Sequence, residues 1–157
     1  MTVASVKVQY AAPRENGMPP PSLITRWIKE AMQHGRTTHA TRGVEVGVRV
    51  VGEKEMTDLN QRYRHKSGPT NVLSFEYDAP QPRVRIPFLG DIVVCAPVVH
   101  QEAIAQGKDK EAHWAHLVIH GSLHLLGFDH EEPGAAHTME ALEASILVHL
   151  GYADPYS

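Results

Sequence analysis

The sequence predicts an α+β domain in which about four strands form one small mixed sheet and about five helices pack on it. Two observations carry this prediction: strand-like alternation of apolar residues is concentrated in the first 95 residues, and helical periodicity dominates the remainder. In addition, no linker, internal repeat or low-complexity tract divides the chain. We therefore expect residues 1–157 to form a single domain, which is long enough to bury a core of its own.

Four segments have the pattern of β-strands. Residues 43–51 (GVEVGVRVV) alternate strictly, which is typical of a half-buried strand. Residues 3–10 end in alternation, and residues 72–77 form a third short apolar segment. Residues 89–95 are apolar enough to be a central strand of the sheet.

Five further segments favour helices. Ser22 is expected to cap the first helix, whose apolar stripe runs to about residue 34. Apolar residues spaced by three and four predict a second helix over residues 53–65. The second half of the chain is expected to be helical over residues 97–106, 109–126 and 135–149.

Composition excludes several classes of protein. Apolar residues make up 42% of the chain and charged residues 21%, as in ordered globular domains. Apolar runs are too short to span a bilayer, and no secretory signal is recognisable. The single cysteine, Cys95, lies in an apolar run that reads as a buried strand. We therefore expect a cytoplasmic protein without membrane association.

Charge is distributed unevenly between the two halves of the chain. Residues 1–90 carry 13 Lys and Arg against 8 Asp and Glu, whereas residues 91–157 carry 2 against 10. The chain is therefore not a generally basic nucleic-acid binder, yet its N-terminal half can present a basic surface to an anionic partner.

A cluster of histidines at residues 120–130 (HGSLHLLGFDH) predicts a metal site. His120 and His124 lie four residues apart, so on a helix both can direct a ring nitrogen at one ion. Gly127 suits the left-handed residue that ends a helix, which allows His130 to return to the same ion. Three imidazoles leave a fourth position open, as in catalytic zinc sites. The alternative is a helix with surface histidines that bind no metal.

The ligand spacing matches the H-E-x-x-H-x-x-G-x-x-H pattern of one class of zinc proteases, with one important difference. In those enzymes the Glu after the first His is the general base, and here that position is Gly121. The base of a protease is therefore missing. Gly121 would instead leave space beside the metal for a bulky substrate or for a closely approaching backbone.

The histidine segment, together with PTNVLSF at residues 69–75 and LGDIV at residues 89–93, resembles the YbeY family of bacterial endoribonucleases. The resemblance covers roughly residues 45–155. It implies a metal-dependent endoribonuclease that acts on single-stranded RNA. It further implies a role in ribosomal RNA maturation, notably at the small-subunit end, and in ribosome quality control, with the ribosome or its assembly proteins as partners.

The resemblance also implies a catalytic arginine, which maps onto Arg64. The residue type agrees with this role, because the guanidinium fork suits a phosphodiester and can stabilise charge that develops on phosphorus. Arg62 and Lys66 are candidates for substrate binding, although both could equally belong to a solvated charged face.

Several roles stay open at this point. Asp129 could orient a ligand histidine, act as an acid or base, or cap its own backbone. A different enzyme, a metal hydrolase of peptides or amides, would need to recruit a base such as Asp129. A non-enzymatic alternative is a ribosome-assembly factor with a structural metal. His113 and His116 are expected to pack or to support the site, and Asn71 and Ser74 could border it.

Overall fold

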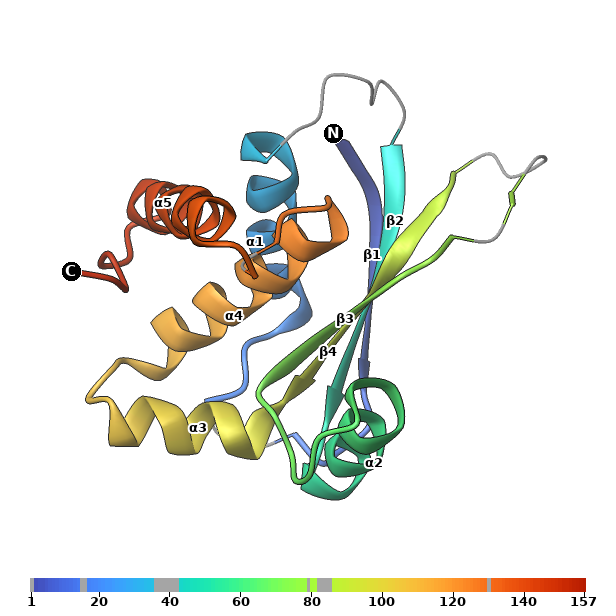
Figure 1. The fold of residues 1–157 in the computed structure, drawn as a ribbon, viewed down its shortest axis with the longest axis vertical. Coiled ribbons are helices and arrows are strands. Elements are labelled where there is room, and N and C mark those ends of the chain that lie inside the picture. Colours follow the sequence, from blue (N-terminus) through green and yellow to red (C-terminus); the bar gives the residue numbers. More distant parts are fainter. Residues whose placement is uncertain (1, 15–16, 36–42, 79, 82–85, 130) are drawn as a thin grey trace.

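The computed structural model describes residues 2–14, 17–35, 43–78, 80–81, 86–129 and 131–157. In these residues a four-stranded sheet and five helices form the mixed α+β fold that the sequence predicts (Figure 1). The elements follow one another as β1 (Thr2–Tyr10), α1 (Pro21–His34), β2 (Gly43–Val51), α2 (Glu53–Arg64), β3 (Val72–Glu76), β4 (Phe88–Cys95), α3 (Ala96–Ala105), α4 (Lys110–Leu125) and α5 (Pro133–His149).

The sheet is mixed, with the strand order β1-β2-β4-β3. β1, β2 and β4 run parallel to one another, and β3 pairs antiparallel with β4. Val48 at the middle of β2 pairs with Val8 on one side and Ile92 on the other. β4 pairs with β2 on one side and with β3 on the other, so it lies inside the sheet. This confirms the prediction that its apolar sequence suits a central strand.

Both faces of the sheet are packed by side chains that alternate along the strands. Val46, Val48 and Val50 of β2 belong to the larger core, which they share with α1, α4 and α5. Val51 of β2 joins the smaller core on the other face, where Met56 of α2 packs. Figure 1 shows α1, α4 and α5 together on one side of the sheet, apart from α2.

The first helix begins one residue earlier than its expected cap. α1 starts at Pro21, Pro20 occupies the N-cap position, and no side chain caps the helix, so the prediction that Ser22 is the cap is wrong. The physical reason is that proline suits the first helical position: its φ is already helical, and the N–H that it lacks would have no partner there.

α4 is the helix that carries the histidine cluster, and most of its surface is buried. It packs against α1, α3, α5, β3 and β4. The side chain of Asp109 caps its start by accepting a hydrogen bond from the backbone N–H of Ala112 at 3.2 Å. Gly127 follows its end with φ +95°, the left-handed conformation predicted for it. In the described part of the chain, no helix is both long and apolar enough to cross a membrane.

Candidate metal centre and the groove beside it

α4 brings two of the predicted metal ligands together. The Nε2 atoms of His120 and His124 lie 3.0 Å apart. Two imidazoles on one tetrahedral zinc ion would hold their nitrogens about 3.4 Å apart, because each Zn–N bond measures roughly 2.0–2.1 Å. The two rings are therefore close to the separation that a shared ion requires. His130, the third predicted ligand, lies outside the described residues.

A buried carboxylate fixes the orientation of His120. The Nδ1 atom of His120 donates a hydrogen bond to Glu143 Oε2 at 2.8 Å, and the Glu143 side chain is 1% exposed. Glu143 also accepts hydrogen bonds from His116 Nε2 and from the Tyr156 hydroxyl, each at 2.6 Å. With its Nδ1 acting as donor, a neutral His120 carries its lone pair on Nε2, the atom that faces His124.

The charge of Glu143 is maintained despite its burial. Burial alone would raise its pKa, but the hydrogen bonds from His116 and His120 outweigh that effect and lower the pKa to about 2. Burial, together with the hydrogen bond that the Tyr156 hydroxyl donates to Glu143, raises the pKa of Tyr156, which therefore stays a neutral donor.

The donor set fits a divalent metal ion of the zinc type. Zinc accepts neutral imidazole nitrogens, and metal-binding histidines typically donate their second ring N–H to a carboxylate, as His120 does to Glu143. His120 and His124 are partly exposed at the end of a buried helix, so substrate can approach them.

Gly121 is buried and packs closely against the sheet, so it does not provide space for a substrate. A Cβ atom at this position would lie 3.0 Å from Ile92 Cγ2 and 3.1 Å from Ser74 Oγ. The space that the missing side chain leaves is filled by the side chains of Ile92, Ser74 and Val72, so neither a substrate nor another backbone, the two explanations that the sequence left open, occupies it. At the position where the zinc proteases carry their general base, this chain therefore has a glycine at which α4 packs against β3 and β4.

A groove of about 790 Å³ extends from the two histidines along β3 to the end of α2. It brings Arg64, Lys66 and Asp129 to the same opening as His120 and His124, although the arginine and the first histidine are far apart in sequence. The described residues that line it are Asn60, Arg64, Lys66, Thr70, Asn71, Val72, Leu73, Ser74, Phe75, Glu76, His120, His124, Gly127, Phe128, Asp129 and Glu131. Arg62 is not among them, so its predicted role in substrate binding gains no support from this groove.

Arg64 is the last residue of α2, and its side chain is exposed. His65 follows it in the left-handed conformation, with φ 57°, and turns the chain towards β3. Arg64 Nη2 lies 3.4 Å from the carbonyl oxygen of Ser74, which is a long contact. Its guanidinium therefore keeps most of its donors available to a ligand in the groove.

Ser74 and Asn71 connect the groove to its surroundings. Ser74 Oγ donates to the carbonyl oxygen of Gly121 at 2.8 Å and so fastens β3 to α4. Asn71 Nδ2 donates to the carboxylate of Glu102 at 3.0 Å, and His113 Nε2 lies 2.9 Å from the same group. Burial lowers the pKa of His113, although Glu102 partly opposes the shift.

Asp129 is exposed at the mouth of the groove. Its Oδ1 accepts a hydrogen bond from the backbone N–H of Glu131 at 3.1 Å, which is a local cap of its own loop. The carboxylate also faces the groove that contains the two histidines.

Sequence reasoning missed Glu143 as a functional residue. A signal was nevertheless present: Glu143 occupies the buried stripe of α5, at helical spacing from Met139, Ile146 and Leu147. A carboxylate inside an apolar stripe needs partners, since an unpaired buried charge is costly. On the neighbouring helix, His116 and His120 provide them.

Comparison with known proteins places the chain among named relatives. Residues 14–151 match a family model described as endoribonuclease YbeY. A protein of Nitrosococcus oceani named endoribonuclease YbeY is 48% identical over 153 residues, which cover 97% of this chain and 96% of the relative. A protein of the same name from Cellvibrio japonicus is 52% identical over 139 residues, which cover 88% of this chain and 76% of the relative.

A solved structure has the same fold. The solution structure of a Thermotoga maritima protein superimposes with a TM-score of 0.56 at 23% sequence identity, over 97% of this chain and 99% of the other. At this level of identity, the similarity concerns the fold alone.

Proposed function

The chain belongs to the YbeY family of endoribonucleases, and on that premise we propose that it is a metal-dependent endoribonuclease that cleaves single-stranded RNA. One observation carries the proposal: the two facing imidazoles of His120 and His124 share a groove with the guanidinium of Arg64. This groove offers metal ligands and an anion-binding group to the same substrate. Metal-assisted cleavage of a phosphodiester makes use of both.

His120 and His124, with His130 as the third ligand expected from the sequence, would hold the ion. When bound, a zinc ion supplies Lewis-acid polarisation of a phosphoryl oxygen and makes an attacking water more acidic. Glu143 is a positioning residue, because it holds His120 with Nε2 directed into the groove. The histidine ligands also accept nickel, copper or iron. We propose zinc because three imidazoles with an open fourth position are typical of catalytic zinc sites.

The protein groups around the ion would bind and orient the RNA. Arg64 can donate two parallel hydrogen bonds to a phosphate and can stabilise negative charge that develops during cleavage. Lys66 lines the same groove and adds positive charge for the backbone of the RNA. Asp129 lines the mouth of the groove and is the candidate acid or base for proton transfer.

The biological substrate that we propose is ribosomal RNA, in particular the end of the small-subunit RNA. This part of the proposal rests on the family resemblance of the histidine and PTNVLSF segments. We further propose that the protein acts in the cytoplasm, in contact with the ribosome or its assembly proteins, and that it also acts in ribosome quality control.

The test is cleavage of a single-stranded RNA by purified protein before and after removal of metal by chelation. We expect chelation and His120→Ala each to reduce the rate by at least about a thousandfold, since metal catalysis contributes several kcal/mol. Arg64→Ala should reduce it by about a hundredfold to a thousandfold, the effect of losing one donor that stabilises transition-state charge. Arg62→Ala should have a smaller effect than Arg64→Ala.

Matched controls separate the outcomes. His137→Ala removes an exposed histidine of α5 and should leave the rate unchanged. Cleavage that survives chelation and both alanine substitutions would identify a contaminating nuclease and refute the proposal. RNA binding without cleavage by fully metallated protein would favour the assembly factor, and turnover of short peptides would favour the peptide hydrolase.

A further inference from the structure

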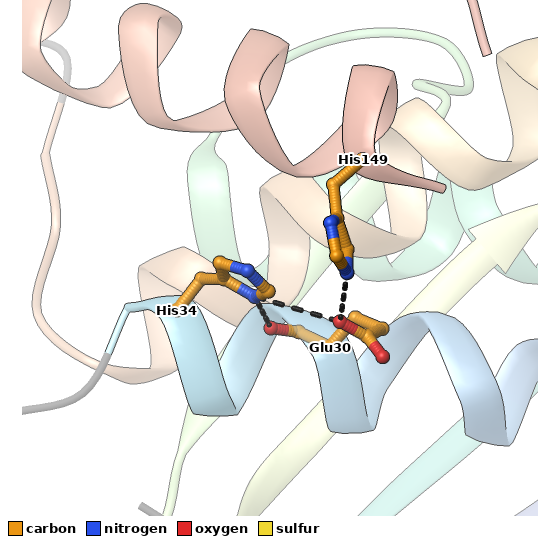
Figure 2. Close-up of side chains that lie close together, drawn as sticks. All are labelled: Glu30, His34 and His149. Carbon is orange, nitrogen blue, oxygen red and sulfur yellow. Dashed lines mark hydrogen bonds and ion pairs between the residues drawn. The ribbon is translucent and has the colours of Figure 1, made fainter. Parts of the chain in front are cut away.

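A second group of metal-binding side chains lies where the C-terminal turns of α1 and α5 meet. Figure 2 shows Glu30 and His34 on α1, with His149 reaching towards them from α5. Each residue offers one ligand atom, and these atoms lie within 4.8 Å of one another. We call these three residues the helix-end cluster. It does not line the groove that contains His120 and His124.

The geometry of the helix-end cluster follows from helix spacing and packing. Glu30 and His34 are four residues apart and therefore share one face of α1. Glu30 Oε2 lies 3.5 Å from His34 Nδ1 and 3.6 Å from His149 Nε2. His34 Nδ1 also lies 2.9 Å from the backbone carbonyl oxygen of Glu30, so an ion bound through this nitrogen would replace that hydrogen bond. Two ligands of one tetrahedral zinc ion lie about 3.4 Å apart, so the carboxylate already has nearly the required separation from both rings.

The electrostatic surroundings also favour a cation. His34 and His149 each lie in the last turn of their helix, where the unpaired carbonyl groups give the helix end a partial negative charge. Glu30 adds a full negative charge between them. Among the described residues, the ion-pair partners of Glu30 are these two histidines.

The donor set determines the class of ion. One carboxylate oxygen and two imidazole nitrogens suit zinc and its neighbours in the first transition row, whereas calcium and magnesium prefer oxygen ligands alone. The side chain of His149 is 60% exposed, so a fourth ligand can come from water. We propose that the helix-end cluster binds a second divalent transition-metal ion, with zinc as the preferred one, and that this ion fastens the end of α5 to α1.

Such an ion would stabilise the helices that surround the first site. α5 carries Glu143, which holds His120, and α1 packs against both α4 and α5. Binding to the native arrangement alone shifts the folding equilibrium towards it. The melting temperature of the protein should therefore rise with zinc even after the first site has been removed.

The experiment measures zinc bound per chain by equilibrium dialysis, in full-length protein that carries His120→Ala and His124→Ala. This background should still bind one zinc ion per chain. Adding His149→Ala should weaken that binding by at least about a hundredfold, because loss of a ligand exceeds the roughly 10–100-fold effect of losing a residue that only orients one. Adding His137→Ala instead, an exposed histidine on the same helix, should leave it unchanged.

A second measurement uses the unmodified protein. Titration with zinc should shift the side-chain ring resonances of both His34 and His149 in nuclear magnetic resonance spectra, and Glu30→Gln should weaken the response. Zinc binding that is equal with and without His149→Ala, or zinc titration that leaves both rings unshifted, would overturn the proposal. Neither result bears on cleavage of RNA through His120 and His124.

Discussion

The two groups of histidines and carboxylates in this protein combine the same kinds of side chain in different arrangements. Each pairs two side chains four residues apart on one helix, α4 or α1, with a third side chain from α5. In the groove the carboxylate comes from α5, and Glu143 lies behind the ring that it orients, with 1% of its side chain exposed. In the helix-end cluster the carboxylate of Glu30 lies between two rings and is 25% exposed.

This difference separates a positioning carboxylate from a ligand carboxylate. Glu143 already accepts hydrogen bonds from three side chains, so its oxygens are committed to the protein. The carboxylate oxygen of Glu30 lies 3.5 Å from His34 Nδ1 and 3.6 Å from His149 Nε2, so it can turn towards an ion. We therefore expect the site in the groove to be organised before metal arrives, and the helix-end cluster to be organised by the metal.

The largest effect should come from Glu143→Gln, which keeps the shape of the side chain but removes its charge. The amide accepts hydrogen bonds more weakly, so His120 loses much of its orientation. We expect zinc affinity at the His120–His124 pair to fall by about 10–100-fold, measured by competition with a chelating dye. Glu140→Gln, on the exposed face of the same helix, is the control. An unchanged affinity would mean that the charge of Glu143 does not position His120 for the metal.

Local pattern allowed most of the fold to be predicted. Strict alternation identified Gly43–Val51, and helical spacing identified the five helices to within a few residues. The error in the predicted start of α1 has a local cause. Pro21 suits the first helical position, and this places Ser22 inside the helix rather than at its cap.

The candidate site was only partly predictable, because its supporting contacts connect distant segments. The spacing of His120 and His124 is local and was visible in the sequence. The hydrogen bond from His120 to Glu143 depends on how α4 and α5 pack, and periodicity within one helix does not encode that packing. Arg64 was assigned by resemblance, and only the fold brings it to the groove.

An intermediate effect is expected from Gly121→Ala, which tests how strongly the site helix depends on the sheet. The added methyl group would meet Ile92 Cγ2 at 3.0 Å and Ser74 Oγ at 3.1 Å, so these side chains or α4 must shift slightly to admit it. We expect a loss of about 1–3 kcal/mol in the free energy of unfolding, the usual cost of overpacking. Gly134→Ala is the control, since nothing lies within 4 Å of its added methyl group. Urea denaturation of both variants measures the difference.

The smallest effect concerns pH and His113, a histidine that binds no metal in either proposal. His113 is 4% exposed, and burial lowers its pKa from 6.5. His113 is therefore harder to protonate in the folded protein than in the unfolded chain. Its contribution to stability is full above pH 6.5 and is lost as pH falls below that value.

His113→Gln tests this because glutamine can still hydrogen-bond to Glu102 and does not titrate. Urea midpoints at pH 8 and pH 5.5 should show that wild-type protein loses more stability on acidification than the variant does. His137→Gln, which replaces an exposed histidine, should follow the wild type at both pH values. Equal losses in wild type and His113→Gln would mean that this ring is protonated without cost. The interior around α4 would then tolerate charge as readily as the surface around the helix-end cluster, and the contrast between the two regions would rest on hydrogen bonding alone.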